Sequence, residues 1–356
     1  MKIRDIKTFT VDCFRTNWVF VKVYTDSGVD GVGEATLEYK EKALVGAVEH
    51  IKESLVGQNP LEIEKHWHSI YRVPVYQLLG GKVNDTVRIY VNGWFAGAKT
   101  PKEFGEKARI AAKRGITAMK WDPFGKSYLE ISNKDLTLAL ECIGEVRAAV
   151  GEDVDLLIEG HGRFNIPTGI KIAKELEQFK PMFFEEPVPP DDLDALKAVR
   201  DKSPVAISAG ERLYTRWDYK RMFDLMAADY IQPDISHAGG IMELKKIAAE
   251  AECRYIPFAP HNPSGPIANA ATLQLAATCP NFSVLEIMYS DVEWRKDVVN
   301  EQLEYSCGYM KIPDRPGLGI EINEDECAKH PYKPHTLRHY TGALTDIRPA
   351  KTEFYF

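Results

Sequence analysis

Carboxylate side chains recur through the middle of this sequence, each at the end of a short apolar run. Glu159, Glu185 and Glu211 follow three such runs and are spaced 26 residues apart. Three carboxylates gathered in one buried place repel one another and lose hydration, at a cost on the order of several kcal/mol per ion unless a cation compensates. Ligands that are all oxygen favour Mg²⁺, with Mn²⁺ as the alternative. The triplet therefore predicts a site for one divalent metal ion, whereas a single glutamate would more simply be explained as a surface acid or a salt-bridge partner.

A second group of residues has the chemistry needed for proton transfer. His261 lies in A-P-H-N-P-S-G-P, and Asp234 ends the preceding apolar run. A carboxylate behind an imidazole fixes its tautomer and raises its basicity, so this pair predicts a general base. His161 comes two residues after Glu159, and strand alternation predicts that it shares the same face. It therefore suits a second proton-transfer group, and Glu286 adds an acid at the end of the last apolar run.

Further polar residues, near the predicted strand ends or in an N-terminal loop, are candidate substrate contacts. Lys120 is suited either to neutralising a substrate anion or to pairing with the carboxylate cluster. Asn92, Arg163 and Asn262 are equally well explained as turn or scaffold residues, since Asn is common where the backbone bends. His237, in D-I-S-H-A-G-G, is interpreted as structural. The candidate substrate-binding set is Lys120, Asp122, Arg15, Asn17, Asn92, Arg163 and Asn262.

Eight apolar runs between residues 87 and 290, separated by helical patterns, must position these side chains. Strands that alternate with helices predict parallel strands joined by right-handed crossovers, and eight of them can close a barrel. The C-terminal ends of barrel strands meet at one mouth, which would bring the polar residues together. The equal spacing of Glu159, Glu185 and Glu211 predicts that they stand at equivalent heights on neighbouring strands. The runs are VRIYVNGW (87–94), AMKWDP (118–123), DLLIEGH (155–161), MFFEEP (182–187), VAISAGE (205–211), YIQPDIS (230–236), YIPFAPH (255–261) and VLEIMYS (284–290).

The two ends of the chain have other patterns. Residues 1–40 alternate like a three-stranded meander, and helices are predicted at about 41–56 and about 60–71. Late in the chain, MKIPDRPGLGIEINE resembles a strand and turn that we expect to return to the N-terminal region. The expected fold is α/β: a modified TIM barrel of the (β/α)7β type with an α+β capping domain. The expected domains are a capping domain at 1–86, the catalytic barrel at 87–305, and a C-terminal segment at 306–356 that returns to the cap.

Composition narrows the classes of function. The net charge of −7 and a pI near 5.8 argue against nucleic acid as a partner, because a phosphate backbone demands a basic surface. No apolar stretch approaches the length of a membrane span, and the N-terminus lacks the apolar core of a signal peptide. The six cysteines are scattered without a C-x-x-C pair, so neither a disulfide framework nor a zinc site is predicted. We therefore expect a cytoplasmic enzyme with a small-molecule substrate.

These motifs resemble the enolase superfamily, specifically its mandelate racemase-like branch. The matching segments are F-F-E-E-P-V, S-A-G-E-R, Q-P-D-I-S-H-A-G-G-I, A-P-H-N-P-S-G-P and the late P-G-L-G-I-E-I, so that the resemblance covers nearly the whole chain. It implies a homo-oligomer. It further implies metal ligands at Glu159, Glu185 and Glu211, a catalytic dyad of His261 and Asp234, and a strand-eight acid at Glu286.

Within that branch, the E-x-H of strand three is similar to the acid-sugar dehydratases, with the galactonate and gluconate dehydratases nearest in pattern. This likeness implies that His161 helps to expel a hydroxyl group. Three departures stand out. Glu159 replaces the usual Asp, and K-W-D ending at Asp122 replaces a K-x-K whose second lysine is a base, which argues against racemisation. A few tens of residues that carry a substrate-proximal loop are missing between Arg72 and Val73.

The resemblance implies a Mg²⁺-dependent dehydration of an aldonate, such as galactonate or gluconate, to a 2-keto-3-deoxy sugar acid through a metal-stabilised enediolate. His261 would take the proton from C2, protonated His161 would donate to the departing C3 hydroxyl, and Glu286 would hydrogen-bond the substrate carboxylate. Two alternatives stay open. One is epimerisation or cycloisomerisation of an acid sugar, and the other is a non-catalytic homologue that only binds such a sugar.

Overall fold

The computed structural model describes residues 1–60, 73–289, 291–335 and 354 of the chain. The N-terminal unit, residues 1–60, begins with the antiparallel sheet of β1 (Ile3–Asp12), β2 (Asn17–Thr25) and β3 (Gly31–Glu34), in that order. Helix α1 (Glu41–Leu55) follows, so the predicted meander and the first predicted helix are both confirmed. The helix expected at about 60–71 and the junction at Arg72 lie outside the described residues.

The barrel begins after the short helix α2 (Val75–Leu78). Its parallel strands pair in sequence order, and β10 returns to pair with β4. At the seventh position Phe258 bridges Ile231 on one side and Phe282 on the other, which closes the gap between β9 and β10. The strands are β4 (Thr86–Asn92), β5 (Ala118–Trp121), β6 (Asp155–Glu159), β7 (Phe183–Glu185), β8 (Ile207–Ala209), β9 (Tyr230–Ile231) and β10 (Leu285–Met288).

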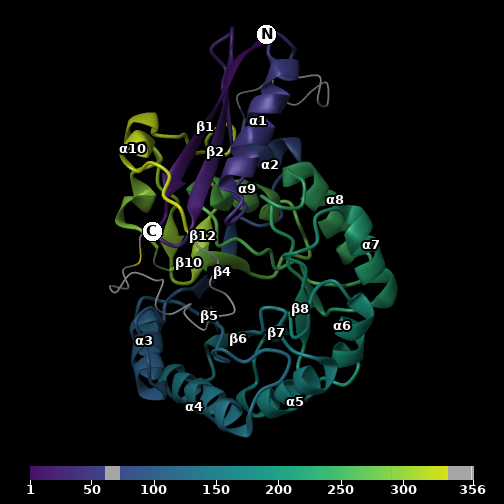
Figure 1. The fold of residues 1–356 in the computed structure, drawn as a ribbon. Coiled ribbons are helices and arrows are strands. Elements are labelled where there is room, and N and C mark those ends of the chain that lie inside the picture. The colour runs from purple at the N-terminus through teal and green to yellow at the C-terminus, as the bar shows by residue number, and fades with distance from the viewer. Residues whose placement is uncertain (61–72, 290, 336–353, 355–356) are drawn as a thin grey trace.

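Seven α-helices connect the eight strand positions in the described part of the barrel, which confirms the predicted (β/α)7β architecture. Figure 1 shows α3 to α8 as an outer arc around the strands. None of the helices in the described residues is long and apolar enough to cross a membrane. The connecting helices are α3 (Pro101–Lys113), α4 (Asn133–Val150), α5 (Ile166–Leu176), α6 (Leu193–Arg200), α7 (Arg216–Leu225), α8 (Gly240–Glu252) and α9 (Pro266–Ala276), with a 3₁₀ turn, η1 (Glu177–Phe179), after α5.

Most of these helices begin at a side-chain cap, because the first N–H groups of a helix have no partner within it. Thr100 and Glu103 form a reciprocal capping box at the start of α3. The N-cap residue of helix α9 is instead Gly265, which has no side chain that could accept a hydrogen bond from the first N–H groups. Glu34 of β3 takes that place: its carboxylate accepts from the N–H of Gly265 at 2.8 Å and of Ala268 at 2.9 Å. A strand of the N-terminal unit therefore caps a helix of the barrel.

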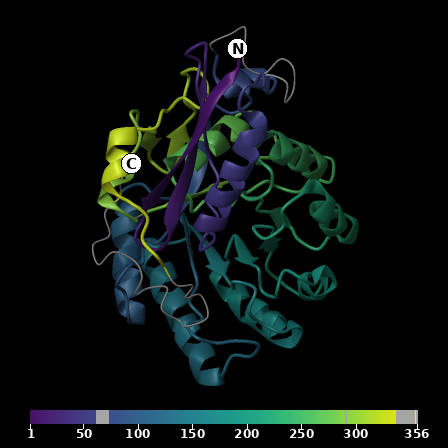
Figure 2. The ribbon, with the colours of Figure 1, turned by 45° about the horizontal axis from the view of Figure 1, so that its top comes forward.

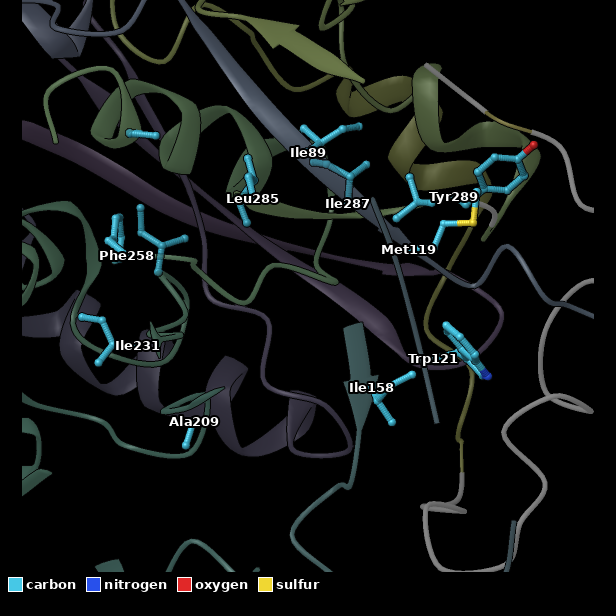
Figure 3. Close-up of a cluster of buried hydrophobic side chains, with 14 of the residues drawn as sticks. Ile89, Met119, Trp121, Ile158, Ala209, Ile231, Phe258, Leu285, Ile287 and Tyr289 are labelled. Carbon is cyan, nitrogen blue, oxygen red and sulfur yellow. The ribbon is translucent and has the colours of Figure 1, made fainter. Parts of the chain in front are cut away.

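Two apolar clusters lie on either side of the barrel wall. The larger one packs the outward strand residues against the helices, and Figure 3 shows part of it, including Ile89, Ile158 and Ile287. The smaller one consists of the residues that alternate with these along the strands, so it fills the barrel interior. Its buried members are Tyr90, Ala118, Leu157, Phe183, Ala259 and Val284.

The C-terminal segment contacts both parts of the molecule. After η2 (Glu293–Lys296), the strands β11 (Tyr305–Ser306) and β12 (Tyr309–Lys311) form a hairpin, and β12 pairs antiparallel with β4. The first part of the segment predicted to return to the cap thus pairs with the barrel instead, because β4 leaves an edge at its start where β5 and β10 do not pair with it. Helix α10 (Glu324–Lys329) does reach the N-terminal sheet (Figures 1 and 2), and Glu324 accepts from Lys22 of β2 at 2.8 Å. The exact domain boundaries remain a prediction.

Candidate active site

The polar side chains at the barrel mouth lie two residues further along each strand than the apolar side chains that fill the barrel interior. Residues two apart on a strand share a face, so each polar side chain follows an inward apolar one. Leu157 precedes Glu159 in this way, and Phe183 precedes Glu185. The same step leads to the rest of a buried or half-buried polar layer, comprising Asn92, Lys120, Glu159, Glu185, Ser208, Gln232, His261 and Glu286.

The three predicted ligand carboxylates do come together. Each of Glu159, Glu185 and Glu211 has an oxygen within 4.8 Å of an oxygen of the other two. Glu159 and Glu185 are lateral neighbours on β6 and β7, but the neighbour of Glu185 on β8 is Ser208. The expectation from the equal spacing, that all three stand at one height, is therefore wrong for Glu211.

Glu211 reaches the cluster because the chain turns at Gly210, just beyond the end of β8. Gly210 has φ +134°, in the region that favours glycine. A Cβ atom there would lie 2.5 Å from the hydroxyl of Tyr219, which itself donates to the Gly210 carbonyl. The equal spacing of 26 residues therefore does not mean that the three glutamates occupy equivalent positions on their strands.

Lys120 lies within the carboxylate cluster. Its Nζ is 2.8 Å from Glu185, 3.4 Å from Glu159 and 3.2 Å from Glu286. Gln232 adds a hydrogen bond to Glu185 at 2.7 Å. Even so, burial raises the pKa of Glu159 to about 7, and burial together with Glu159 raises the pKa of Glu185 well above its usual value. One ammonium group therefore leaves much of the negative charge uncompensated.

These residues fit a hard divalent cation. The donors are carboxylate oxygens, which Mg²⁺ and Mn²⁺ prefer, and their crowding leaves the charge excess that a cation would offset. The Oε1 atom of Gln232, buried beside Glu185, has no hydrogen-bond partner among the described residues, so the mouth offers a further polar atom for a bound group or its water. The residues that could hold the ion are Glu159, Glu185 and Glu211.

The predicted dyad has the geometry of a general base. Nδ1 of His261 lies 2.8 Å from Asp234, and Nε2 lies 3.1 Å from Glu211 and 3.8 Å from Glu286. Burial disfavours the charged ring, but these carboxylates outweigh it and raise the pKa of His261 to about 10. Asp234 is itself buried and accepts from the N–H of Ser236 at 2.6 Å, which fixes the carboxylate behind the ring.

Glu286 is held from three sides. Asn92 donates to it at 3.0 Å, and the backbone N–H of Asn262 donates at 3.2 Å. Although burial favours the neutral acid, Lys120 and His261 lower the pKa of Glu286 below its usual value. Glu286 is therefore an anchored carboxylate, and Asn92 acts on it directly.

His161 lies on the other side of the cluster, beside Glu159. Its backbone N–H donates to Glu159 at 2.6 Å, and its Nδ1 lies 2.6 Å from Asp122. Strand alternation is not what points it there, because β6 ends at Glu159 and His161 has a left-handed backbone with φ +50°. Such a conformation is uncommon for a residue other than glycine and is concentrated at functional sites.

The remaining candidate substrate contacts have partners within the protein. Asp122 accepts from Arg163, and the side chain of Asn262 bonds to helix α9 through Thr272. Asn17 exchanges hydrogen bonds with the backbone of Lys333 at 2.9 and 3.1 Å.

Arg15 lies nearer to the mouth. It pairs with Glu38 of the N-terminal unit and donates to the carbonyl of Pro263, two residues after His261. The loop between β1 and β2 therefore contacts the segment that carries the predicted base.

The sequence matches the family "Enolase C-terminal domain-like" over residues 103–326. It also matches "Mandelate racemase / muconate lactonizing enzyme, N-terminal domain" over residues 6–128. The first match alone covers more than half of the chain and includes every predicted metal ligand. The chain belongs to the enolase superfamily.

Three relatives of this enolase superfamily member are each identical to it at about a third of the aligned positions. A D-gluconate dehydratase of Thermoproteus tenax is 33% identical over 351 residues, covering 90% of this chain and 71% of the relative. A D-xylonate dehydratase of Haloferax volcanii is 31% identical, with coverage of 94% and 90%. A D-galactonate dehydratase of Ralstonia pickettii is 32% identical, with coverage of 91% and 93%.

Solved structures of the superfamily have the same fold. A mandelate racemase/muconate lactonizing enzyme-like protein from Rubrobacter xylanophilus matches with a TM-score of 0.83 and 30% identity, covering 94% of this chain and 98% of that one. A member of the enolase superfamily from Salmonella Typhimurium matches with a TM-score of 0.86 and 27% identity, covering 93% and 98%.

Sequence reasoning missed two residues of this superfamily member's candidate site and interpreted a third as structural. Gln232 bonds Glu185, and Arg212 contacts both Glu186 at 2.8 Å and Glu211 at 3.2 Å. His237, interpreted as structural, has a ligand-type atom within 4.8 Å of those of Asp234 and His261. Each lies within three residues of a predicted site residue, so adjacency to the motifs Q-P-D and G-E-R was the signal available.

Proposed function

We propose that this chain is a Mg²⁺-dependent aldonate dehydratase that converts a 2,3-dihydroxy sugar acid into a 2-keto-3-deoxy acid. It is an enzyme of the hydro-lyase class, which breaks a carbon–oxygen bond with loss of water. D-Gluconate, D-galactonate and D-xylonate, named in its relatives, define the substrate class, namely five- and six-carbon aldonates.

One observation carries the proposal: two imidazole rings flank the carboxylate cluster, one beside Glu159 and the other beside Glu211. His161 bonds Glu159 through its backbone, and His261 approaches Glu211 through Nε2. Each ring also has its own carboxylate at Nδ1. An elimination needs a base for the C–H proton and an acid for the leaving hydroxyl, and these two groups supply one of each.

The residues of the chain divide the work as follows. His261, oriented by Asp234, removes the proton from C2. His161 protonates the hydroxyl that departs from C3, so that the oxygen leaves as water together with the electron pair of the C–O bond. Lys120, 3.2 Å from Glu286, orients the substrate carboxylate, and Glu286 takes up a proton as the anionic substrate binds beside it, so that its hydroxyl donates a hydrogen bond to that carboxylate as negative charge builds up there. Each proton-transfer group is expected to contribute roughly 10²–10⁴ in rate.

The divalent cation would be held by Glu159, Glu185 and Glu211. When bound, it supplies positive charge to the substrate carboxylate and so makes the neighbouring C–H more acidic. Lys120 would still contact Glu185, which keeps that ligand in place in the absence of the ion.

The proposal is tested by incubating the purified protein and Mg²⁺ with D-gluconate, D-galactonate, D-xylonate and their stereoisomers. We expect one or a few of them to yield a 2-keto-3-deoxy acid, and the product to disappear on addition of EDTA. The variant His261→Asn should lose at least about 10²-fold in kcat while still binding Mg²⁺.

Product mass separates the alternatives. A dehydratase product is lighter than its substrate by one water, whereas an epimerase or cycloisomerase product of the same acid has unchanged mass. Turnover without loss of water would overturn the proposal in favour of an isomerase. Binding of aldonates with no turnover of any kind would favour a non-catalytic homologue. The homo-oligomer implied by the superfamily is a separate prediction for analytical ultracentrifugation.

A further inference from the structure

Asp122 and Arg163 were expected to contact a substrate, yet the structure gives both of them full sets of protein partners. One oxygen of Asp122 accepts from Arg163 at 2.8 Å and from the N–H of Phe124 at 2.9 Å. The other accepts from Arg163 at 2.7 Å and faces Nδ1 of His161 at 2.6 Å. Only 6% of the Asp122 side chain is exposed, so no substrate hydroxyl reaches it easily.

Arg163 is fully buried and connects two mouth loops. Its Nη1 donates to the carbonyl of Gly125, in the loop after β5, at 2.8 Å, and its Nε donates to that of Gly160, after β6, at 3.1 Å. Its remaining nitrogen binds both oxygens of Asp122. A guanidinium has five N–H donors in a rigid fork, and all three nitrogens are used here. Arg163 thus fixes the Asp122 carboxylate relative to both loops.

His161 is the one member of this chain of contacts that reaches the mouth. Its side chain is 19% exposed, against 6% for Asp122 and 0% for Arg163. Its backbone is fixed separately by the bond to Glu159 and by the left-handed turn. The contact at Nδ1 then restrains the plane of the ring.

We propose that Asp122, itself held by Arg163, is a positioning residue for His161. Asp122 accepts the Nδ1–H hydrogen bond, which fixes the ring and assigns proton transfer to Nε2. This inference rests on the proposed function. In the elimination step, Nε2–H gives its proton to the C3 hydroxyl as the C3–O bond breaks, so the oxygen leaves as water. The electron pair released at C2 forms the C2–C3 double bond, and His161 keeps its Nδ1–H on Asp122.

The mouth therefore contains two carboxylate–imidazole pairs with opposite tasks. Asp234 orients the ring that takes a proton, and Asp122 orients the ring that gives one. Both carboxylates accept a backbone N–H, but Asp122 is in addition clamped by a guanidinium. This arrangement makes Asp122 and Arg163 determinants of turnover rather than of substrate binding.

The decisive variant is Asp122→Asn, which keeps the size of the side chain but can present an N–H to Nδ1. On an aldonate that the wild type dehydrates, we expect kcat to fall about 10²-fold with KM changed less than about threefold. The double variant Asp122→Asn/His161→Asn should be no slower than His161→Asn alone, because both changes remove the same function. Arg163→Lys should also lower kcat, but by a smaller factor.

Two readouts separate positioning of the acid from general damage to the site. The 3-deoxy-3-fluoro analogue of the same aldonate loses fluoride, which needs far less protonation, so Asp122→Asn should turn it over within about threefold of the wild-type rate. In D₂O the variant should still exchange the C2 hydrogen of the normal substrate, because His261 is intact. Damage to the whole site would lower both of these rates along with dehydration.

Asp229→Asn is the matched control. Asp229 also accepts from an arginine, Arg200, at 2.7 and 3.0 Å and from a backbone N–H at 2.9 Å, but it lies at the start of β9, away from the mouth. It should leave kcat unchanged. If the wild type dehydrates an aldonate and Asp122→Asn keeps its kcat within threefold, the positioning role is wrong while the proposed function stands. If the wild type dehydrates none, both fail.

Discussion

The Nε2 atom of His261 lies 3.1 Å from a carboxylate oxygen of Glu211, so the predicted base touches one of the predicted metal ligands. A cation bound at Glu211 would repel a protonated ring at this distance. The charge state of the base and the occupancy of the metal site are therefore linked, and the linkage can be measured in the absence of substrate.

Mg²⁺ binding should release protons. In the metal-free protein the pKa of Glu159 is about 7, raised by burial, and that of His261 is about 10, raised by its carboxylate partners against the effect of burial. Below pH 7 Glu159 must lose a proton before it can bind the ion, so affinity should rise as the pH rises through about 7. Calorimetric titration in two buffers of different ionisation enthalpy should detect about one or more protons released per ion near pH 6. A dissociation constant that is the same at pH 6 and pH 8 would contradict this linkage.

Glu185 and Glu186 are adjacent carboxylates with different expected roles. Glu185→Gln should weaken Mg²⁺ binding by at least about tenfold, because it removes a ligand charge from the cluster. Glu186→Gln is the matched control, because the Glu186 carboxylate contacts Arg212 at 2.8 Å and is not one of the predicted ligands. It should change the affinity less than about threefold. Equal losses in the two variants would argue against the assigned ligand set.

Gly210 should tolerate no side chain. Gly210→Ala faces a backbone conformation that costs about 1–3 kcal/mol for other residues, together with a contact at 2.5 Å to Tyr219. We expect a loss of more than about 2 kcal/mol in the free energy of unfolding and weaker Mg²⁺ binding, because Glu211 follows directly. Adding Tyr219→Phe should restore part of the stability by removing the hydroxyl. Denaturant titrations of the single and double variants measure both effects, and full stability in Gly210→Ala would refute the argument.

Glu34 should stabilise helix α9 from outside. Glu34→Ala removes the acceptor for two N–H groups at the start of the helix and should cost about 1–2 kcal/mol in unfolding free energy. Glu34→Gln keeps one acceptor oxygen and should fall between the wild type and Glu34→Ala. Hydrogen exchange at Gly265 and Ala268 should accelerate in the same order. Unchanged exchange at these two amides would mean that the cap is not a significant restraint.

The sequence predicted most of the site because barrel strands deliver their C-terminal residues to one place. Glu159, Glu185 and His261 lie at the ends of apolar runs and Glu286 lies within the last run, and strand alternation places each of them above an apolar residue. The barrel itself followed from the alternation of runs and helical patterns. Neither conclusion needed the lateral register of the strands.

What the sequence could not supply was that register and the course of the loops. Glu211 was expected beside Glu185, yet Ser208 has that place, because β8 ends at Ala209 and Glu211 lies beyond the turn at Gly210. Asn17 and Asn262 have ordinary polar identities, and only their three-dimensional partners show them bonded to Lys333 and to α9.

The stacking of a polar layer on an apolar layer inside one barrel separates two kinds of mutational damage. A substitution at Leu157 or Phe183 would reduce the number of folded molecules, whereas one at Glu159 or Glu185, two residues further on, would reduce the turnover of each molecule that folds. Protein abundance and specific activity can thus drift independently in a population. Substitutions in the polar layer could adapt the site to another reaction while the apolar layer continues to stabilise the same fold.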